Sequence, residues 1–151
     1  MNQIPAWTES LSVGDSLQDM LRQHLFNVGQ QVQRLRDEGD EDVQSAHEVL
    51  NNVVEAMREC FIAEEDKLLT NTCRYKELHM NEHKNYMERL MSIILKIPRG
   101  GIDIEELFAV VRDWATRHAP TIDTLCKKCG YTIYHTPTQI ETVCVHRNKL
   151  S

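Results

Sequence analysis

The chain has 151 residues, a formal net charge of −6 and a pI near 5.6. This length suits one domain with its own hydrophobic core. The acidic balance and the lack of a long basic block exclude a surface built for nucleic acid or an anionic membrane. No apolar run approaches the roughly 20 residues of a membrane span, and Met1 to Gly14 lacks the pattern of a signal peptide. We therefore expect a soluble cytoplasmic protein. The five cysteines are an odd number in a chain without an export signal, which favours reduced thiols and metal ligation over a disulfide framework.

The first half of the chain contains two segments with apolar residues at helical spacing. The polar run 37–41, with Gly39 inside it, is expected to end the first helix. In the second segment Glu64 occupies a position where the pattern calls for an apolar residue, so its carboxylate must have a partner inside the fold. The first stripe is Leu17, Leu21, His24, Val28, Val32 and Leu35, and the second is Val43, His47, Leu50, Val54, Met57, Phe61, Glu64 and Leu68.

The second half contains two further stripes of the same kind. The run that begins at Pro98 cannot continue a helix and is expected to close the third, whereas Asp103 is the expected N-cap of the fourth. These four segments predict an all-α fold, an up-down-up-down four-helix bundle over residues 15–125 that follows an N-terminal arm, residues 1–14. The third stripe is His79, His83, Tyr86, Leu90 and Ile93 or Ile94, and the fourth is Leu107, Val111, Trp114, His118 and Ile122.

Several residues on these stripes are of types that bind metals. The four-residue spacing of His79 and His83 puts two imidazoles on one face of a helix, which makes half of a metal site. Glu64 stands upstream of this pair, and His118 and Asp123 stand downstream. Together these residues are the ligand types of a carboxylate-bridged iron site inside a helical bundle.

The same residues carry a resemblance to a known family. Their order along roughly residues 7–125 resembles the hemerythrins, in particular the bacterial ones. The resemblance implies a four-helix bundle that holds two non-haem irons. It also implies that His79, His83 and His118 form the three-histidine side and that Glu64 and Asp123 bridge the irons. The matching positions are Trp7, Val13-Gly14, Phe61, Glu64-Glu65, His79, His83, Trp114, His118 and Asp123.

The chain departs from the family pattern at the second iron position. Cys60 stands where the second-helix histidine should be, one residue before Phe61. An ungapped alignment of the first helix puts Arg22 at the other histidine position, whereas a gapped alignment matches Gln23-His24 to the family's Gln-His pair. Periodicity favours His24, because it lies on the apolar stripe and Arg22 is rotated roughly 120° from the centre of that stripe.

Two arrangements of this second half-site stay open. His24 and Cys60 could ligate a second metal, and a thiolate would then shift its redox properties. Alternatively, Arg22 places a guanidinium there and pairs with Glu64 and Asp123, leaving one metal bound by three imidazoles and carboxylates. Oxygen carriage in the manner of the family needs one electron from each of two ferrous ions, so a one-metal site is not an ordinary oxygen carrier.

Pro120 adds a second question, since it falls between His118 and Asp123. Proline lacks a backbone donor and crowds the carbonyl four residues earlier, so it kinks or ends a helix. A kink here would displace Asp123 from a bridging position. If the fourth helix ends near Pro120 in any case, the proline is harmless.

The last segment, residues 126–151, has a signature of its own. The motif Cys126-Lys127-Lys128-Cys129-Gly130 has the form of a zinc knuckle. The alternation in 131–134 and 140–145 predicts a β-hairpin around Thr136-Pro137-Thr138. A closed, structural zinc site is the expectation, and a reduced C-x-x-C is the alternative. The predicted zinc ligands are Cys126, Cys129, Cys144 and His146.

The residues leave three classes of function open. The first is a hemerythrin-like, non-haem iron protein that binds or senses oxygen or nitric oxide. The second is a metal- or redox-responsive interaction module, with a protein partner bound through the tail. The third is an iron-dependent peroxidase or oxidase. No arrangement of nucleophile and base supports the third class, so we expect a protein that is not an enzyme.

Overall fold

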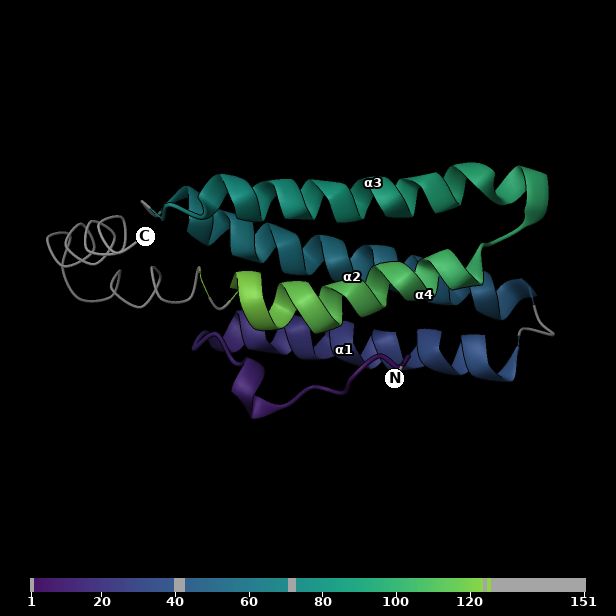
Figure 1. Ribbon diagram of the computed structural model, residues 1–151, viewed down its shortest axis with the longest axis horizontal. Helices are drawn as coiled ribbons and strands as arrows, with labels where there is room; N and C mark the ends of the chain where they lie inside the picture. Colours follow the sequence, from purple (N-terminus) through teal and green to yellow (C-terminus); the bar gives the residue numbers. More distant parts are fainter. Residues whose placement is uncertain (1, 40–42, 71–72, 124, 126–151) are drawn as a thin grey trace, which may run out of the picture.

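The computed structural model describes residues 2–39, 43–70, 73–123 and 125, and within these ranges the chain is all-helical, with no strand. Successive helices lie side by side and run in opposite directions in a helical bundle (Figure 1). None of the described helices is both long and apolar enough to cross a membrane. The helices are α1 (Ser16–Glu38), α2 (Val43–Leu69), α3 (Lys76–Gly100) and α4 (Ile104–Asp113), with a short 3-10 turn, η1 (Glu9–Leu11), and a π-helix, η2 (Trp114–Ile122).

The helix ends follow from local sequence signals. The side chain of Asp15 accepts a hydrogen bond from the backbone N–H of Gln18 at 2.9 Å and caps α1. Asp103 does the same for α4, which confirms the predicted N-cap. Gly39 adopts a φ of 74° directly after α1, a left-handed conformation that favours glycine, so the predicted break is also confirmed.

The end of α3 differs from the prediction. The helix runs through Pro98 and ends at Gly100, so the expectation that the run beginning at Pro98 would close the helix was wrong. Pro98 lies in the last turn, where its missing N–H removes a single intrahelical bond and little helix remains to be disturbed. The helix stops at Gly101, whose φ is 76° and whose N–H donates to the carbonyl of Ile97 at 2.9 Å.

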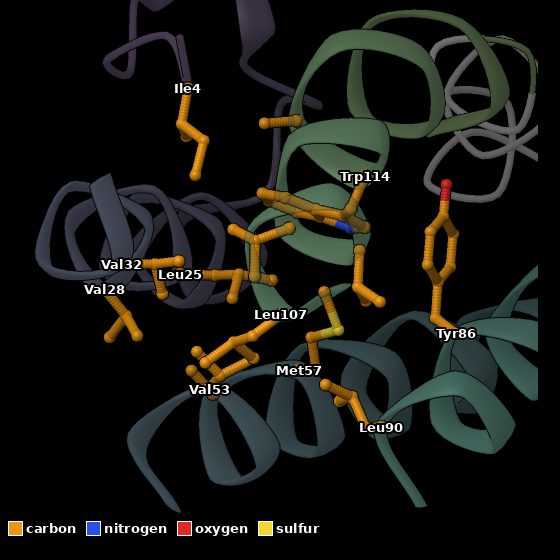
Figure 2. Close-up of a cluster of buried hydrophobic side chains, with 14 of the residues drawn as sticks. Ile4, Leu25, Val28, Val32, Val53, Met57, Tyr86, Leu90, Leu107 and Trp114 are labelled. Atoms are coloured by element: carbon orange, nitrogen blue, oxygen red, sulfur yellow. The ribbon is translucent and has the colours of Figure 1, made fainter. Parts of the chain in front are cut away.

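Aliphatic and aromatic side chains from all four helices fill the middle of the bundle (Figure 2). Trp114 is fully buried and its ring centroid lies 4.9 Å from that of Phe26 on α1. The N-terminal arm is fastened to this core, because Ile4 is buried and its N–H donates to Gln33 Oε1 at 2.8 Å. The buried polar groups lie at one end of the bundle, beyond the apolar middle. At this end α1 and α3 begin, and α2 and η2 end.

Candidate metal centre

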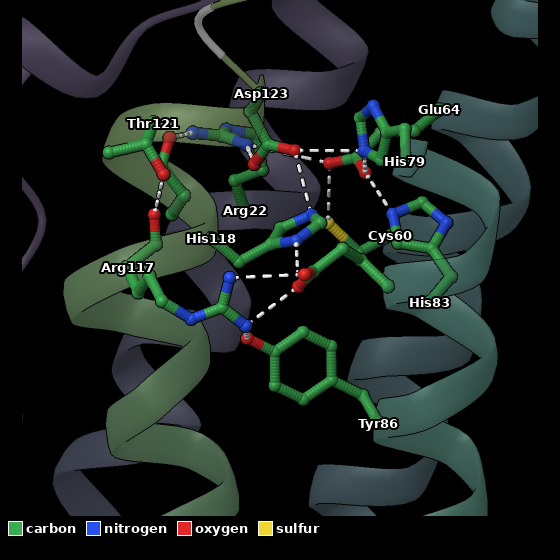
Figure 3. A network of polar contacts seen from close by, with 12 residues as sticks. Arg22, Cys60, Glu64, His79, His83, Tyr86, Arg117, His118, Thr121 and Asp123 are labelled. Atoms are coloured by element: carbon green, nitrogen blue, oxygen red, sulfur yellow. Dashed lines mark hydrogen bonds and ion pairs between the residues drawn. The ribbon is translucent and has the colours of Figure 1, made fainter. Parts of the chain in front are cut away.

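Five of the predicted ligands come together at that end of the bundle (Figure 3). All five side chains are buried, and one ligand atom from each lies within 4.8 Å of every other. Glu64 lies on α2, His79 and His83 lie on α3, His118 lies on η2, and Asp123 directly follows η2. The cluster consists of Glu64, His79, His83, His118 and Asp123.

The Nε2 atoms of the three histidines converge on two carboxylate oxygens. His79 Nε2 lies 3.1 Å from Glu64 Oε2 and 3.0 Å from Asp123 Oδ1. His83 Nε2 lies 2.8 Å from the same oxygen of Glu64, and His118 Nε2 lies 3.0 Å from Asp123 Oδ1. The cluster therefore presents three imidazole nitrogens and two carboxylate oxygens to one small volume.

The directions of these contacts test whether a metal ion fits. Although the distances are short, four of these buried atoms make no hydrogen bond of acceptable direction within the described part of the chain. They are His83 Nε2, both ring nitrogens of His118 and Asp123 Oδ1. Buried polar atoms without such bonds call for a partner. Three imidazoles with carboxylates are a donor set for divalent first-row metals, so the residues fit a metal ion.

The protonation of the cluster also suits metal binding. Burial, only partly opposed by the charge of Glu64, lowers the pKa of His118 to about 2, so its imidazole is neutral. Burial alone would raise the pKa of Glu64, but its close contacts with the imidazoles of His79 and His83 hold this pKa well below its usual value. Neutral imidazole and ionised carboxylate are the forms that bind metals.

The π-helix η2 brings Asp123 into the cluster. In an α-helix two residues five apart point about 140° away from each other, since each residue turns the chain by about 100°. The hydrogen bonds of a π-helix span five residues, which places such a pair on one face. The N–H of Asp123 bonds to the carbonyl of His118, five residues earlier. Pro120 lies within η2 and Asp123 still reaches the cluster, so of the two possibilities left open for Pro120, the displacement of Asp123 is not what the structure has.

Arg22 occupies the other side of the two carboxylates. Its side chain is fully buried, and Nη1 contacts both Glu64 Oε1, at 3.4 Å, and Asp123 Oδ2. Nη2 donates to the carbonyls of Leu11 at 3.1 Å and Ala119 at 3.4 Å. Each carboxylate therefore turns one oxygen toward the histidines and the other toward the guanidinium. This matches the second of the two arrangements left open above.

The preference for His24 over Arg22 was therefore wrong. His24 is exposed and is not brought to the cluster. The buried face of α1 includes Gln18, Arg22, Leu25 and Gly29, whereas Leu17 of the predicted stripe is 56 % exposed. The predicted stripe is buried at Val28, Val32 and Leu35, and the difference lies in the first turns of α1, where Arg22 can be buried because two carboxylates compensate its charge.

Cys60 lies on the arginine side of Glu64. It is buried, and its Sγ donates to Glu64 Oε1 at 3.5 Å, the same oxygen that Arg22 contacts. Burial, and then the charge of Glu64, raises the pKa of the Cys60 thiol well above its usual value. Cys60 is therefore a neutral thiol beside the cluster and is not among its five grouped ligand atoms.

Two outer carboxylates that periodicity did not single out contact the histidines from behind. Glu65 Oε1 lies 3.0 Å from His83 Nδ1, and Glu82 Oε2 lies 3.5 Å from His118 Nδ1. Arg117 holds Glu82 through two hydrogen bonds of 3.1 and 2.7 Å. Outer carboxylates of this kind orient metal-binding imidazoles. Glu65 had a signal in the sequence, because Glu64-Glu65 is one of the positions that carry the family resemblance, whereas for Glu82 the signal was its place directly before His83.

The predicted zinc ligands Cys126, Cys129, Cys144 and His146, and the predicted hairpin, lie outside the described residues. Comparisons of the chain with protein-family models, with curated proteins and with solved structures find no match.

Proposed function

We propose that this chain is a divergent hemerythrin-like protein that holds one non-haem iron in its bundle. The iron would be bound by His79, His83 and His118 together with Glu64 and Asp123. One observation carries the proposal: both carboxylates turn their second oxygens to Arg22. A guanidinium in that position uses the oxygens that a second metal would need, and its fixed positive charge repels a second cation.

Iron is the metal that the family resemblance implies, and the donor set is compatible with it. Imidazoles together with carboxylates and an open position are typical of non-haem ferrous sites, and five donors would leave a position for an outside ligand. When bound, the iron would supply that open position and a change of oxidation state. The protein's part is to hold the imidazoles. The ring of Phe61, for example, stacks on that of His83 with centroids 3.9 Å apart.

The single metal also decides between the two gases. One ferrous ion supplies one electron, whereas carriage of oxygen in the manner of the hemerythrins draws on two ions. Nitric oxide can bind to one ferrous ion without a second electron donor. We therefore propose a sensor or binder of nitric oxide, with oxygen as a competing ligand, in place of an oxygen store.

Metal counting and magnetic resonance test this proposal directly. The protein is loaded with ferrous iron without air and titrated with nitric oxide. We expect one bundle iron per chain. Ferrous iron has an even number of unpaired electrons and nitric oxide adds one, so we also expect a half-integer spin signal that grows to one spin system per chain. Zinc is counted separately, since it reports on the predicted tail site. Two bundle irons per chain, or no iron uptake, would contradict the proposal.

A matched pair of variants tests the role of the guanidinium. The double variant Arg22→His, Cys60→His restores the histidines that the family resemblance calls for, and we expect its bundle iron to rise from one to two per chain. Arg22→Lys keeps the positive charge and should stay at one. If the double variant also stays at one, exclusion by Arg22 is not the reason for the single metal.

A further inference from the structure

A groove of about 430 Å³ lies along the outside of the cluster, between α2 and α3. Phe61 and Ile62 of α2 and Met80 and Met87 of α3 supply its apolar lining. Its volume is within the range of small-molecule sites. Because methionine side chains adapt to different shapes, such a lining can accept an apolar body without demanding one outline.

The polar groups of the groove differ in how far they are already engaged. Glu65 accepts from His83 Nδ1 at 3.0 Å, so its charge is committed to the metal cluster. Arg58 makes no ion pair within the described residues, and Lys84 pairs only loosely there, at 3.8 Å with the exposed Glu88. Two cations therefore remain at the groove for a ligand.

We propose that this groove binds a small molecule with an apolar body and one anionic group, such as a medium-chain carboxylic acid. The apolar body lies against Phe61, Ile62, Met80 and Met87. The anionic group pairs with Arg58 and Lys84, where a charge-assisted hydrogen bond is stronger than a neutral one.

The groove also contacts the proposed metal centre, because His83 and Glu65 line it. A ligand in the groove replaces water around Glu65 and so changes the hydrogen bond that orients His83. Ligand binding does not need the metal. The coupling between ligand and metal rests on the function proposed above.

Three probes with the same chain length test the charge of the ligand. Decanoate, decanol and decylamine are titrated into the protein below their micelle concentrations, with calorimetry as the measurement. We expect decanoate to bind most tightly, decanol about tenfold more weakly and decylamine weakest, a tenfold change being about 1.4 kcal/mol. Decylamine binding as tightly as decanoate, or no binding by any of the three, would overturn the proposal.

Matched variants locate the site. Met87→Gln alters the groove, whereas Met91→Gln alters the next turn of the same helix, where the methionine is 53 % exposed and outside the groove. We expect weaker decanoate binding for the first and unchanged binding for the second. Should Met87→Gln fail to fold, the exposed Arg58→Ala variant decides: decanoate binding should fall about tenfold and decanol binding should not change. Equal loss of both ligands would contradict the assigned role of Arg58.

Cobalt(II) in the bundle reports on the coupling through its visible spectrum. We expect decanoate to shift the cobalt bands in the wild type and to leave them unchanged in Met87→Gln. If decanoate binds and the bands do not move, the coupling is wrong and the groove site stands. If cobalt does not bind at all, the proposed metal centre fails, and calorimetry still decides whether the groove binds decanoate.

Discussion

The three-histidine side and the Arg22 side of the buried cluster face the same two carboxylates. The two sides differ in how they contact the carboxylate oxygens of Glu64 and Asp123. Arg22 brings a permanent positive charge that also donates to two backbone carbonyls. The histidine side brings imidazole nitrogens, of which those of His83 and His118 that face the carboxylates lack well-directed hydrogen bonds among the described residues. On the Arg22 side Nη1 and Nη2 are paired within the chain and only Nε lacks a hydrogen bond among the described residues, whereas the donor set on the histidine side fits a metal ion.

The charges of the cluster lead to the same conclusion. With neutral imidazoles, two carboxylates and one guanidinium leave one formal negative charge in a buried site. One divalent ion answers this charge from the histidine side, whereas two would leave a large uncompensated positive charge in a region of low dielectric. The difference between the two sides therefore sets the expected number of metals.

Removing a histidine should have the largest effect. His118→Ala deletes a ligand from the centre of the histidine side, and we expect metal affinity to fall by more than the roughly 10- to 100-fold that outer changes cost. His24→Ala is the matched control, because His24 is exposed on α1. Metal content after dialysis distinguishes them. Full metal occupancy in His118→Ala would refute the assignment.

Removing the positive charge should come next. Arg22→Met keeps an unbranched side chain but leaves Glu64 and Asp123 without their cation, and we expect the metal-free protein to lose about 3–5 kcal/mol of unfolding free energy. Urea denaturation measures the loss. Arg34→Met, at an exposed position of the same helix, should change stability by less than about 0.5 kcal/mol. A loss in Arg22→Met no larger than in Arg34→Met would mean that the buried contacts of Arg22 do not stabilise the fold.

A change behind the histidines should have a smaller effect. Glu65→Gln keeps the shape of the side chain and removes the charge that orients His83, so we expect metal to bind about 10- to 100-fold more weakly. Asp66→Asn removes the charge of the next residue, which is exposed, and should leave the affinity unchanged. Competition with a chelator measures both. Equal effects would show that only the overall charge matters.

The smallest effect is expected at Cys60. Its thiol contacts Glu64 on the oxygen that faces away from the histidines, so Cys60→Ser should leave the visible spectrum of the metal centre unchanged. The cost in stability should be about 1 kcal/mol, since burying a hydroxyl costs more than burying a thiol and its hydrogen bond to Glu64 offsets only part of that difference. A changed spectrum would indicate that the sulfur binds the metal after all.

Periodicity was sufficient for most of the fold. The third and fourth stripes proved to be buried faces, including His83, Leu90, Trp114 and His118. The same pattern placed Glu64 inside, where its carboxylate would need partners. These predictions succeeded because a helix repeats every 3.6 residues and each of the stripes had one dominant apolar face.

Periodicity failed where a charged side chain is buried because distant residues of opposite charge pair with it. Arg22 reads as a surface residue in any hydropathy pattern, and its partners Glu64 and Asp123 lie 42 and 101 residues away along the chain. The family resemblance named Asp123 as a ligand, but periodicity alone could not place it in the cluster. A search for the α-helical period cannot see that the last turns are a π-helix.

This π-helix makes the spacing of the chain as important as the identity of its residues. A π-helix is the form that an α-helix takes when it absorbs one extra residue. If one residue between His118 and Asp123 were deleted, the two would lie four apart, and an α-helix would keep them within about 40° of each other on one face. With the present spacing, an α-helix would turn Asp123 about 140° away from His118. Among related chains, we therefore expect a segment that is one residue shorter to form an α-helix in place of the π-helix, with the aspartate still on the face of the histidine.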